Sequence, residues 1–348
     1  LNVFKKLLRP QTKIMVMVKA FSYGSGDVEI ASLLQYQNVD YLAVAVTDEG
    51  VLLRNAGIHT PVIVMNPEQS SFQQIIDYQL EPNIYSIELL ENFVKTISQN
   101  GLNKFPVHLK IDTGMNRLGF KTNEEIARVI QQVQESGCVK VKSVFSHLAA
   151  SDDSSFDAFT REQISRFEEV SAMISKSFAY KIDRHILNSA GIERFPDKQF
   201  EMVRLGIGLY GISNTGLPLQ NIGTLRSTVS QVKKVQLTET VGYSRKGKIE
   251  VESEIAIVPL GYADGLDRKL GNRNGSAFIH GSRVPIIGNI CMDMLMLDVT
   301  GLNVKPGEKV EIFGPNISIT ELAEKAGTIP YEILTGISQR VKRVYLQE

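Results

Sequence analysis

A lysine at the end of an apolar strand is the first group in this sequence whose position suggests chemistry. Residues 13–18 are apolar after the first position, which is typical of a strand buried on both faces, and Lys19 follows directly. Barrel enzymes carry their reactive groups at the ends of such strands. Lys19 is therefore either an ordinary solvated ammonium or an amine that forms a Schiff base.

Other polar groups recur where apolar segments end. They are Lys110 and Arg117 on and after the segment 107–112, His147 after the next strand, Asn188 and Ser189 in the segment 188–191, and Arg204, Gly206 and Ile207 in the segment 204–208. Each has an ordinary alternative, because Lys110 could pair with Asp112, a lone histidine is usually a core residue and an arginine is usually a surface cation. Solvated charges have no reason to recur at strand ends, so the set favours a site.

The elements that would position these groups alternate between apolar strand and amphipathic helix. Strands are expected to begin at residues 13, 41, 61, 81, 105, 139, 185 and 202, with helical patterns such as 87–99, 123–135 and 159–177 between them. Eight such units predict a (β/α)8 TIM-type barrel. A doubly wound open sheet is the alternative, but no GxGxxG motif follows the first strand.

The alternation of strands and helices ends after about residue 221. Short segments rich in Val, Ile and Thr alternate with Gly and Asn turns; the strands expected there are 254–260, 276–280, 283–287 and 310–314, with a turn at 271–275. The sequence therefore predicts an α/β fold with two domains, a barrel over residues 1–222 and a mostly β domain over residues 223–348.

Composition excludes several classes of protein. Lys plus Arg and Asp plus Glu both number 38, so no basic excess favours binding to nucleic acid. The only two cysteines, Cys138 and Cys291, have no CxxC spacing, which fits a reducing compartment and argues against a disulfide or metal framework. No apolar run approaches the ~20 residues of a membrane span. We expect a cytoplasmic protein that binds neither metal, membrane nor nucleic acid.

Seven segments together resemble the alanine racemase family, whose members are pyridoxal-phosphate (PLP) enzymes with a barrel domain and a C-terminal β domain. They are VKAFSYGSG (18–26), KIDTGMNRLGF (110–120), SHLAASDD (146–153), NSAG (188–191), RLGIGLYG (204–211), GYADG (261–265) and GNICMD (288–293). The resemblance covers nearly the whole chain. Because the family begins with an additional strand, it also implies that the barrel is truncated at its N-terminus or was cut from a longer chain, such as a fusion behind a cell-wall peptide ligase.

The resemblance implies a role for each matching residue. Lys19 would hold PLP and act as one of two bases at the substrate Cα, with Tyr262 as the opposing base. The PLP-binding residues would be Lys19, Tyr23, His147, Asn188, Ser189, Arg204, Gly206 and Ile207. Arg204 would face the pyridine nitrogen and keep it unprotonated, since an arginine only donates hydrogen bonds.

The substrate side of the site follows from the same resemblance. Arg117, Met292 and Asp293 would bind the amino acid, and Lys110 would be carbamylated, turning a cation into an anion that orients Arg117. In the family Tyr262 reaches the site from the partner subunit, which implies a homodimer with shared active sites. Gln339 stands where some members have a tyrosine at the entrance.

Three functions are compatible with these residues. The preferred one is PLP-dependent interconversion of L-alanine and D-alanine by two bases, which supplies D-alanine for peptidoglycan. A second is a PLP enzyme of the same fold acting on other amino acids, such as a broad-specificity racemase for serine; a decarboxylase is disfavoured by Arg204, because decarboxylases place an acid there. The third is a non-catalytic PLP-binding module, which would usually lack the β domain and the tyrosine of GYADG.

Overall fold

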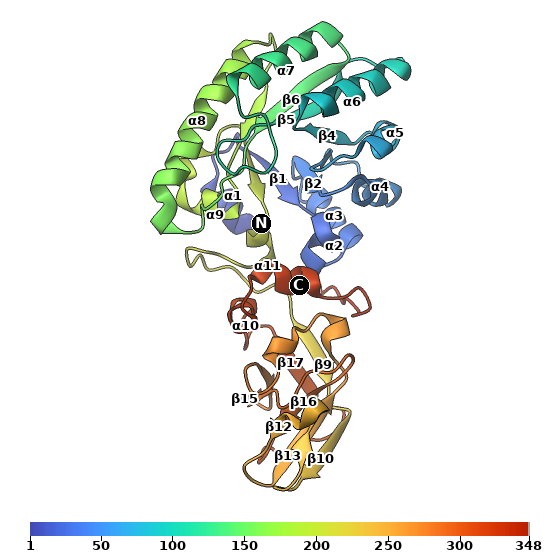
Figure 1. Ribbon diagram of the computed structural model, residues 1–348, viewed down its shortest axis with the longest axis vertical. Coiled ribbons are helices and arrows are strands. Elements are labelled where there is room, and N and C mark those ends of the chain that lie inside the picture. Colours follow the sequence, from blue (N-terminus) through green and yellow to red (C-terminus); the bar gives the residue numbers. More distant parts are fainter. Residues whose placement is uncertain (347–348) are drawn as a thin grey trace. The chain divides into compact units, whose positions relative to one another are not determined.

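The computed structural model describes residues 1–346 of the chain. The chain forms two compact units (Figure 1): one comprises residues 1–22, 26–209 and 213–219, and the other comprises residues 23–25, 210–212 and the chain from residue 220 onward. In the described part of the chain, no helix combines the length and the apolar character needed to cross a membrane.

Eight parallel strands form the centre of the first unit, in the order β7-β6-β5-β4-β3-β2-β1-β8. In chain order they are β1 (Lys13–Met17), β2 (Tyr41–Val44), β3 (Val62–Val64), β4 (Glu81–Ile84), β5 (Phe105–Lys110), β6 (Val139–Phe145), β7 (Asp183–His185) and β8 (Met202–Leu205). The two edges approach each other where the peptide N–H of Arg204 donates to the carbonyl of Leu187 at 3.0 Å. The predicted TIM-type barrel is confirmed.

Helices connect the strands and lie on the outside of the sheet (Figure 1). They are α1 (Asn2–Leu7), α2 (Lys19–Gly24), α3 (Asp27–Tyr36), α4 (Thr47–Asn55), α5 (Phe72–Asp77), α6 (Ile87–Gln99), α7 (Asn123–Ser136), α8 (Asp157–Lys176) and α9 (Ser189–Arg194). Local sequence explains several starts: the hydroxyl of Ser86 caps α6, and Thr122 forms a capping box with Glu125 at α7.

The seventh strand differs from the sequence prediction. It was expected to begin at His185, but β7 ends at that residue. The buried side chains of Ile186 and Leu187 extend the apolar pattern beyond the part that pairs with β6, so the pattern alone places the strand too late. His185 therefore lies at the carboxyl end of its strand, where the candidate site residues also lie.

The second unit is mostly antiparallel β structure, as predicted. Its strands are β9 (Leu225–Thr228), β10 (Gln231–Val235), β11 (Thr240–Val241), β12 (Gly247–Lys248), β13 (Ser253–Val258), β14 (Ser276–Ile279), β15 (Ser282–Pro285), β16 (Leu295–Asp298) and β17 (Lys309–Phe313). They form sheets in the orders β10-β13-β16, β11-β12 and β15-β14-β17-β9. Two short helices, α10 (Ile319–Ala326) and α11 (Pro330–Gly336), follow the last strand.

Candidate active site

Lys19 begins a turn of left-handed helix. The four residues after it, Ala20 to Tyr23, have φ between 47° and 55°, and Gly24 has φ 79°. Each non-glycine residue in this conformation costs roughly 1–2 kcal/mol, because its Cβ approaches the following carbonyl oxygen. Such a turn persists only where surrounding contacts hold it, and backbone strain of this kind is concentrated at functional sites.

Two side chains hold this turn. The carboxylate of Glu49 on α4 accepts hydrogen bonds from the peptide N–H groups of Ala20 and Ala45, both at 2.7 Å. At the other end of the turn, the Arg343 guanidinium donates to the Gly24 carbonyl through Nε (3.1 Å) and Nη2 (2.9 Å). The backbone that carries Lys19 is thus fixed by one acid and one base from distant parts of the sequence.

Cations gather around Lys19. Burial lowers the pKa of the Lys19 amine, the charge of Arg117 lowers it further, and Glu49 partly opposes both effects. Burial also holds the pKa of Lys110 well below its usual value, and the charges of Arg204 and Arg117 add to this effect. These mutual effects show that the basic groups of Lys19, Lys110, Arg117 and Arg204 lie within electrostatic reach of one another, an arrangement that favours an anionic ligand.

Asp112 does not neutralise Lys110. Its Oδ1 accepts from the peptide N–H groups of Gly114 (2.9 Å) and Asn116 (3.1 Å), so it shapes the loop that carries Arg117. Lys110 instead lies over the ring of Phe145, with Nζ 4.6 Å from the ring centre. No close ion pair joins Lys110 to Asp112 in the described part of the chain, although the charge of Asp112 partly opposes the lowering of the Lys110 pKa.

Arg204 on β8 is 4% exposed and is held by residues at the carboxyl ends of two strands, β6 and β7. Its Nη1 donates to His185 Nδ1 at 2.8 Å and to the His185 carbonyl at 3.1 Å. Its Nη2 donates to the carbonyls of Ser146 (2.6 Å) and Ile186 (3.0 Å) and to His147 Nδ1 (3.2 Å). Both terminal nitrogens of Arg204 are thus occupied, whereas its Nε–H has no acceptor among the described residues and can donate to a ligand.

Both histidines bound to Arg204 are neutral at physiological pH. Burial, followed by the charge of Arg204, holds the pKa values of His147 and His185 well below their usual range. Burial and the charge of Arg117 lower the pKa of Arg204 to about 9, so the guanidinium keeps its proton at neutral pH. A cationic donor flanked by two neutral acceptors is therefore the resting state of this cluster.

The segments 188–191 and 204–208 meet at Ser189. Its hydroxyl oxygen accepts from the peptide N–H groups of Gly206 (2.9 Å) and Gly208 (3.2 Å). The Asn188 side chain caps α9: its Oδ1 accepts from Gly191 N (2.9 Å) and from the Ser151 hydroxyl (2.7 Å). The structure thus joins the two predicted cradle segments, and Ile207 begins the short 3-10 helix Ile207–Tyr210 beside them.

Tyr23 lies in a cluster of aromatic side chains that the sequence analysis missed. Its ring stacks on Tyr210 with 4.7 Å between ring centres, and the ring of Tyr331 on α11 lies 5.7 Å away. Burial and Tyr331 raise the pKa of the Tyr23 hydroxyl, so this group stays protonated and acts as a hydrogen-bond donor.

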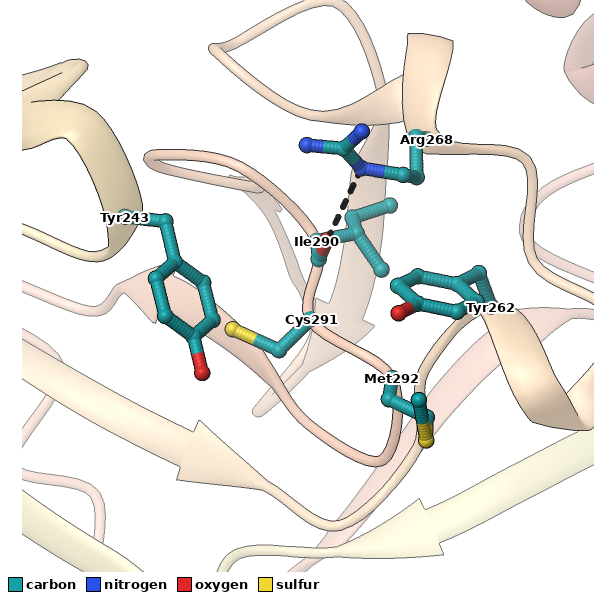
Figure 2. Close-up of a pocket in the computed structure, with 6 residues that line it drawn as sticks. All are labelled: Tyr243, Tyr262, Arg268, Ile290, Cys291 and Met292. Atoms are coloured by element: carbon teal, nitrogen blue, oxygen red, sulfur yellow. Dashed lines mark hydrogen bonds between the residues drawn. The ribbon is translucent and has the colours of Figure 1, made fainter.

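Tyr262 and Met292 line one pocket of the second unit. The pocket measures about 300 Å³ and is also lined by Tyr243, Arg268, Ile290 and Cys291. Figure 2 shows Cys291 between the rings of Tyr243 and Tyr262. The Tyr262 backbone is fixed by its N–H bond to the Cys291 carbonyl at 3.0 Å, while its side chain is 42% exposed and available to another molecule.

Asp264 and Asp293 share one arginine. Arg340 donates from Nε to Asp264 and from Nη2 to Asp293, both at 2.7 Å. Asp264 also accepts from the peptide N–H of Gly261 at 2.8 Å, which closes the turn that presents Tyr262. Asp293 therefore lies in an ion-pair network next to Met292 and Tyr262.

Comparisons with known proteins agree with this arrangement. The family models for the N-terminal and C-terminal domains of alanine racemase match residues 1–214 and 222–345, respectively. The chain belongs to the alanine racemase family. An alanine racemase of Methanococcus maripaludis is 35% identical to it, over 98% of this chain and 94% of that protein.

Solved structures of alanine racemases have the same fold. The enzyme of Clostridium difficile 630 matches with a TM-score of 0.93 and 34% identity, over 99% of this chain and 92% of that one. The Bartonella henselae alanine racemase, whose structure contains covalently bound pyridoxal phosphate, matches with a TM-score of 0.89 and 29% identity, over 99% and 95% of the two chains.

Sequence analysis missed three polar residues that hold the site of this alanine racemase homologue. Glu49 lies on a helix four residues after Ala45, where an acid looks like an ordinary exposed residue of the first turn. His185 was expected to begin a strand, and Ser143 was not among the candidate residues. The signal for His185 was available, because the other polar candidates also follow or end strands.

Proposed function

We propose that this protein interconverts L-alanine and D-alanine with PLP as its cofactor. The observation that carries the proposal is the group of four cations, Lys19, Lys110, Arg117 and Arg204, at the carboxyl end of the barrel strands of an alanine racemase homologue. Burial and, after it, the charges of their neighbours lower the pKa values of Lys19, Lys110 and Arg204, and a ligand with several negative charges would relieve the repulsion.

The residues present fit PLP. Its phosphate and phenolic oxygen and the substrate carboxylate are the anions that such a cluster attracts, and the free Nε–H of Arg204 suits an unprotonated aromatic nitrogen. Lys19 would hold the cofactor, and Tyr23, His147, Asn188, Ser189, Gly206 and Ile207 would surround it. Bound there, PLP supplies an aldehyde for covalent attachment and an electron sink that acidifies the substrate Cα–H.

The chain then supplies two proton carriers. Lys19 Nζ removes the Cα proton from one face of the substrate, while the hydroxyl of Tyr262 delivers a proton to the opposite face; exchanged roles convert the other enantiomer. The lowered pKa of Lys19 supports its part, because a general base must lose its own proton near neutral pH. Arg117, Met292 and Asp293 would hold the amino acid.

Tyr262 is proposed to act across a homodimer. Its side chain is 42% exposed, and Met292 beside it is 54% exposed, so the face that carries them remains available to a second copy of the chain. We propose that Tyr262 of each subunit serves Lys19 of the other. The cytoplasm is the proposed location, which the two free cysteines support, and cell-wall peptide is the proposed use of the D-alanine.

Lys110 is proposed to carry a carbamate. A neutral amine attacks CO2, forming an N–C bond and releasing one proton, and the depressed pKa of Lys110 provides that neutral amine. The product is an anion between Arg117 and Arg204. Carbon-13 NMR of enzyme equilibrated with labelled bicarbonate should show a carbamate signal that is absent from Lys110→Met and present in Lys140→Met; its persistence in Lys110→Met would exclude the assignment.

The deciding experiment measures racemisation of a panel of amino acids by the wild type, Lys19→Ala and Tyr262→Phe. We expect alanine to be preferred and each variant to lose about 10²–10⁴-fold in kcat, the usual contribution of a general acid or base. Full activity of Lys19→Ala would overturn the mechanism, and a preference for serine would overturn the substrate.

Co-expression of the two variants tests the shared site. Half of a random mixture is heterodimer, and in each heterodimer one site regains both bases, so activity returns to about a quarter of that of the wild type. If both bases came from one chain, no heterodimer would contain an intact site and the mixture would stay inactive.

A further inference from the structure

Arg204 is one end of a chain of hydrogen bonds that crosses the barrel interior. His185 Nε2 lies 2.8 Å from the Ser143 hydroxyl, and the same hydroxyl lies 2.7 Å from His108 Nδ1. His108 Nε2 in turn lies 2.7 Å from Glu81 Oε2. The chain thus runs over five neighbouring strands, β8, β7, β6, β5 and β4, and ends on a carboxylate.

Arg204 and Glu81, the two ends of the hydrogen-bond chain, determine which group donates in each of its bonds. An arginine only donates, so the bond from Arg204 forms only in the tautomer of His185 that accepts at Nδ1 and carries its hydrogen on Nε2. The Ser143 hydroxyl accepts that hydrogen and gives its own to His108 Nδ1. His108 then carries its hydrogen on Nε2 and donates to the Glu81 carboxylate, which serves as the acceptor at the end of the chain. Every donor in the chain faces an acceptor, and the tautomers of both histidines are fixed.

Because these residues are buried, the direction of each hydrogen bond affects the stability of the chain. Ser143, His108 and His185 are at most 1% exposed, so a mismatched donor has no water to compensate it. Phe145 stacks on His185 with 4.8 Å between ring centres, and Tyr41 meets the edge of His108 at 5.8 Å, which fixes both rings. If His185 carried its hydrogen on Nδ1, that hydrogen would face the N–H of Arg204.

We propose that Glu81, His108 and Ser143 are positioning residues for the reaction: they fix the tautomer of His185 and so hold the Arg204 guanidinium as a donor to the cofactor ring. None of the three touches the reacting atoms. The role assigned to Arg204 rests on the proposed function, whereas the ordered hydrogen-bond chain is a property of the protein alone.

The test is whether a substitution at Glu81 changes the tautomer of His185. In Glu81→Gln the terminal group can donate as well as accept, so the chain can also run in the reverse direction, in which His185 loses its bond from Arg204 Nη1. Ring nitrogen-15 shifts of histidine-labelled holoenzyme report which nitrogen carries the hydrogen. We expect one Nε2–H tautomer for both histidines in the wild type, and a mixture at both His108 and His185 in Glu81→Gln.

Ser143→Ala supplies the decisive comparison. It interrupts the chain, so adding Glu81→Gln to it should change the spectrum of His108 and leave that of His185 unchanged. Ser171→Ala, at a buried serine of α8 that bonds only within its helix, is the matched control and should change neither histidine. A response of His185 to Glu81→Gln that persists in the double variant, or no response in the single variant, would overturn the proposal.

Kinetics separate this role from a merely structural one. Ser143→Ala and Glu81→Gln should each lower kcat about five- to tenfold with little change in KM, the size expected for one buried hydrogen bond. Unchanged kcat in both variants would overturn the link to Arg204. If the protein did not racemise alanine at all, the proposed function would be wrong. The nitrogen-15 shifts would still test the hydrogen-bond chain, because they do not depend on activity.

Discussion

Replacing Glu49 should release the turn that carries Lys19. Glu49→Ala removes the acceptor for three peptide N–H groups, of which those of Ala20 and Ala45 are bonded at 2.7 Å and that of Val46 more weakly at 3.5 Å. A hydrogen bond to a charged group contributes about 1.5–3 kcal/mol, and the partly exposed carboxylate places each bond near the lower limit. We therefore expect the free energy of unfolding to fall by about 3 kcal/mol.

That loss is a substantial fraction of the strain in the turn. Four left-handed non-glycine residues cost about 4 to 8 kcal/mol together, so removing about 3 kcal/mol of support should favour local opening. Urea denaturation would measure the global loss, and hydrogen exchange at the Ala20 amide would measure the opening. Glu49→Gln keeps one carbonyl acceptor and should lose about half as much stability.

Glu29→Ala is the matched control, because Glu29 is an exposed acid on the neighbouring helix α3 and should change stability by less than about 0.5 kcal/mol. A second measurement uses Lys19 itself in enzyme freed of cofactor. Glu49 raises the pKa of Lys19, so its removal should lower that pKa further and make the amine react with acylating reagents at lower pH. If Glu49→Ala matched Glu29→Ala in stability, amide exchange and Lys19 reactivity, the reasoning would be refuted.

Two further predictions concern residues near the site. Gly24→Ala should destabilise the protein by about 2 kcal/mol or more, because the added Cβ would meet the backbone of α11. Gly57→Ala is the control, because Gly57 has a similar φ but open space around it, and it should cost about 1 kcal/mol. Equal melting temperatures for the two variants would contradict this prediction. In CO2-free buffer and without cofactor, the depressed pKa of Lys110 should make stability fall as the pH drops below about 10.5, the value of the unfolded chain, until the folded pKa is passed. Lys110→Met should flatten that part of the curve, and an unchanged slope would exclude Lys110 as its source.

Much of the barrel could be predicted from the sequence because its signals are local. Apolar strands and amphipathic helices alternate along the chain, and α6 begins and ends where its apolar period and Ser86 cap predict. The same local pattern placed Lys19, Lys110, His147 and Arg204 near strand ends, and parallel strands bring such residues to one end of a barrel.

The left-handed turn could not be predicted in this way. Gly24 and Gly26 suggest an unusual backbone, but Ala20, Phe21 and Ser22 have no preference for positive φ. Their conformation is supported by Glu49, which accepts from the Ala20 N–H and lies 29 residues away in the sequence. Strain that distant side chains maintain leaves no periodic pattern in the strained segment.

The sequence by itself determined the classes of group available: an amine, several cations, a histidine after a strand and a tyrosine in a turn. Only the tertiary structure decided which of them bond. The register places His108 of β5 opposite Ser143 of β6, so these two residues, 35 positions apart, become hydrogen-bond partners. It also places His185 of β7 opposite Phe145, two residues after Ser143, so Ser143 and His185 bond although they are 42 positions apart. The physical reason is that strand pairing sets neighbours across a sheet, whereas local sequence sets only which face of its own strand a side chain occupies.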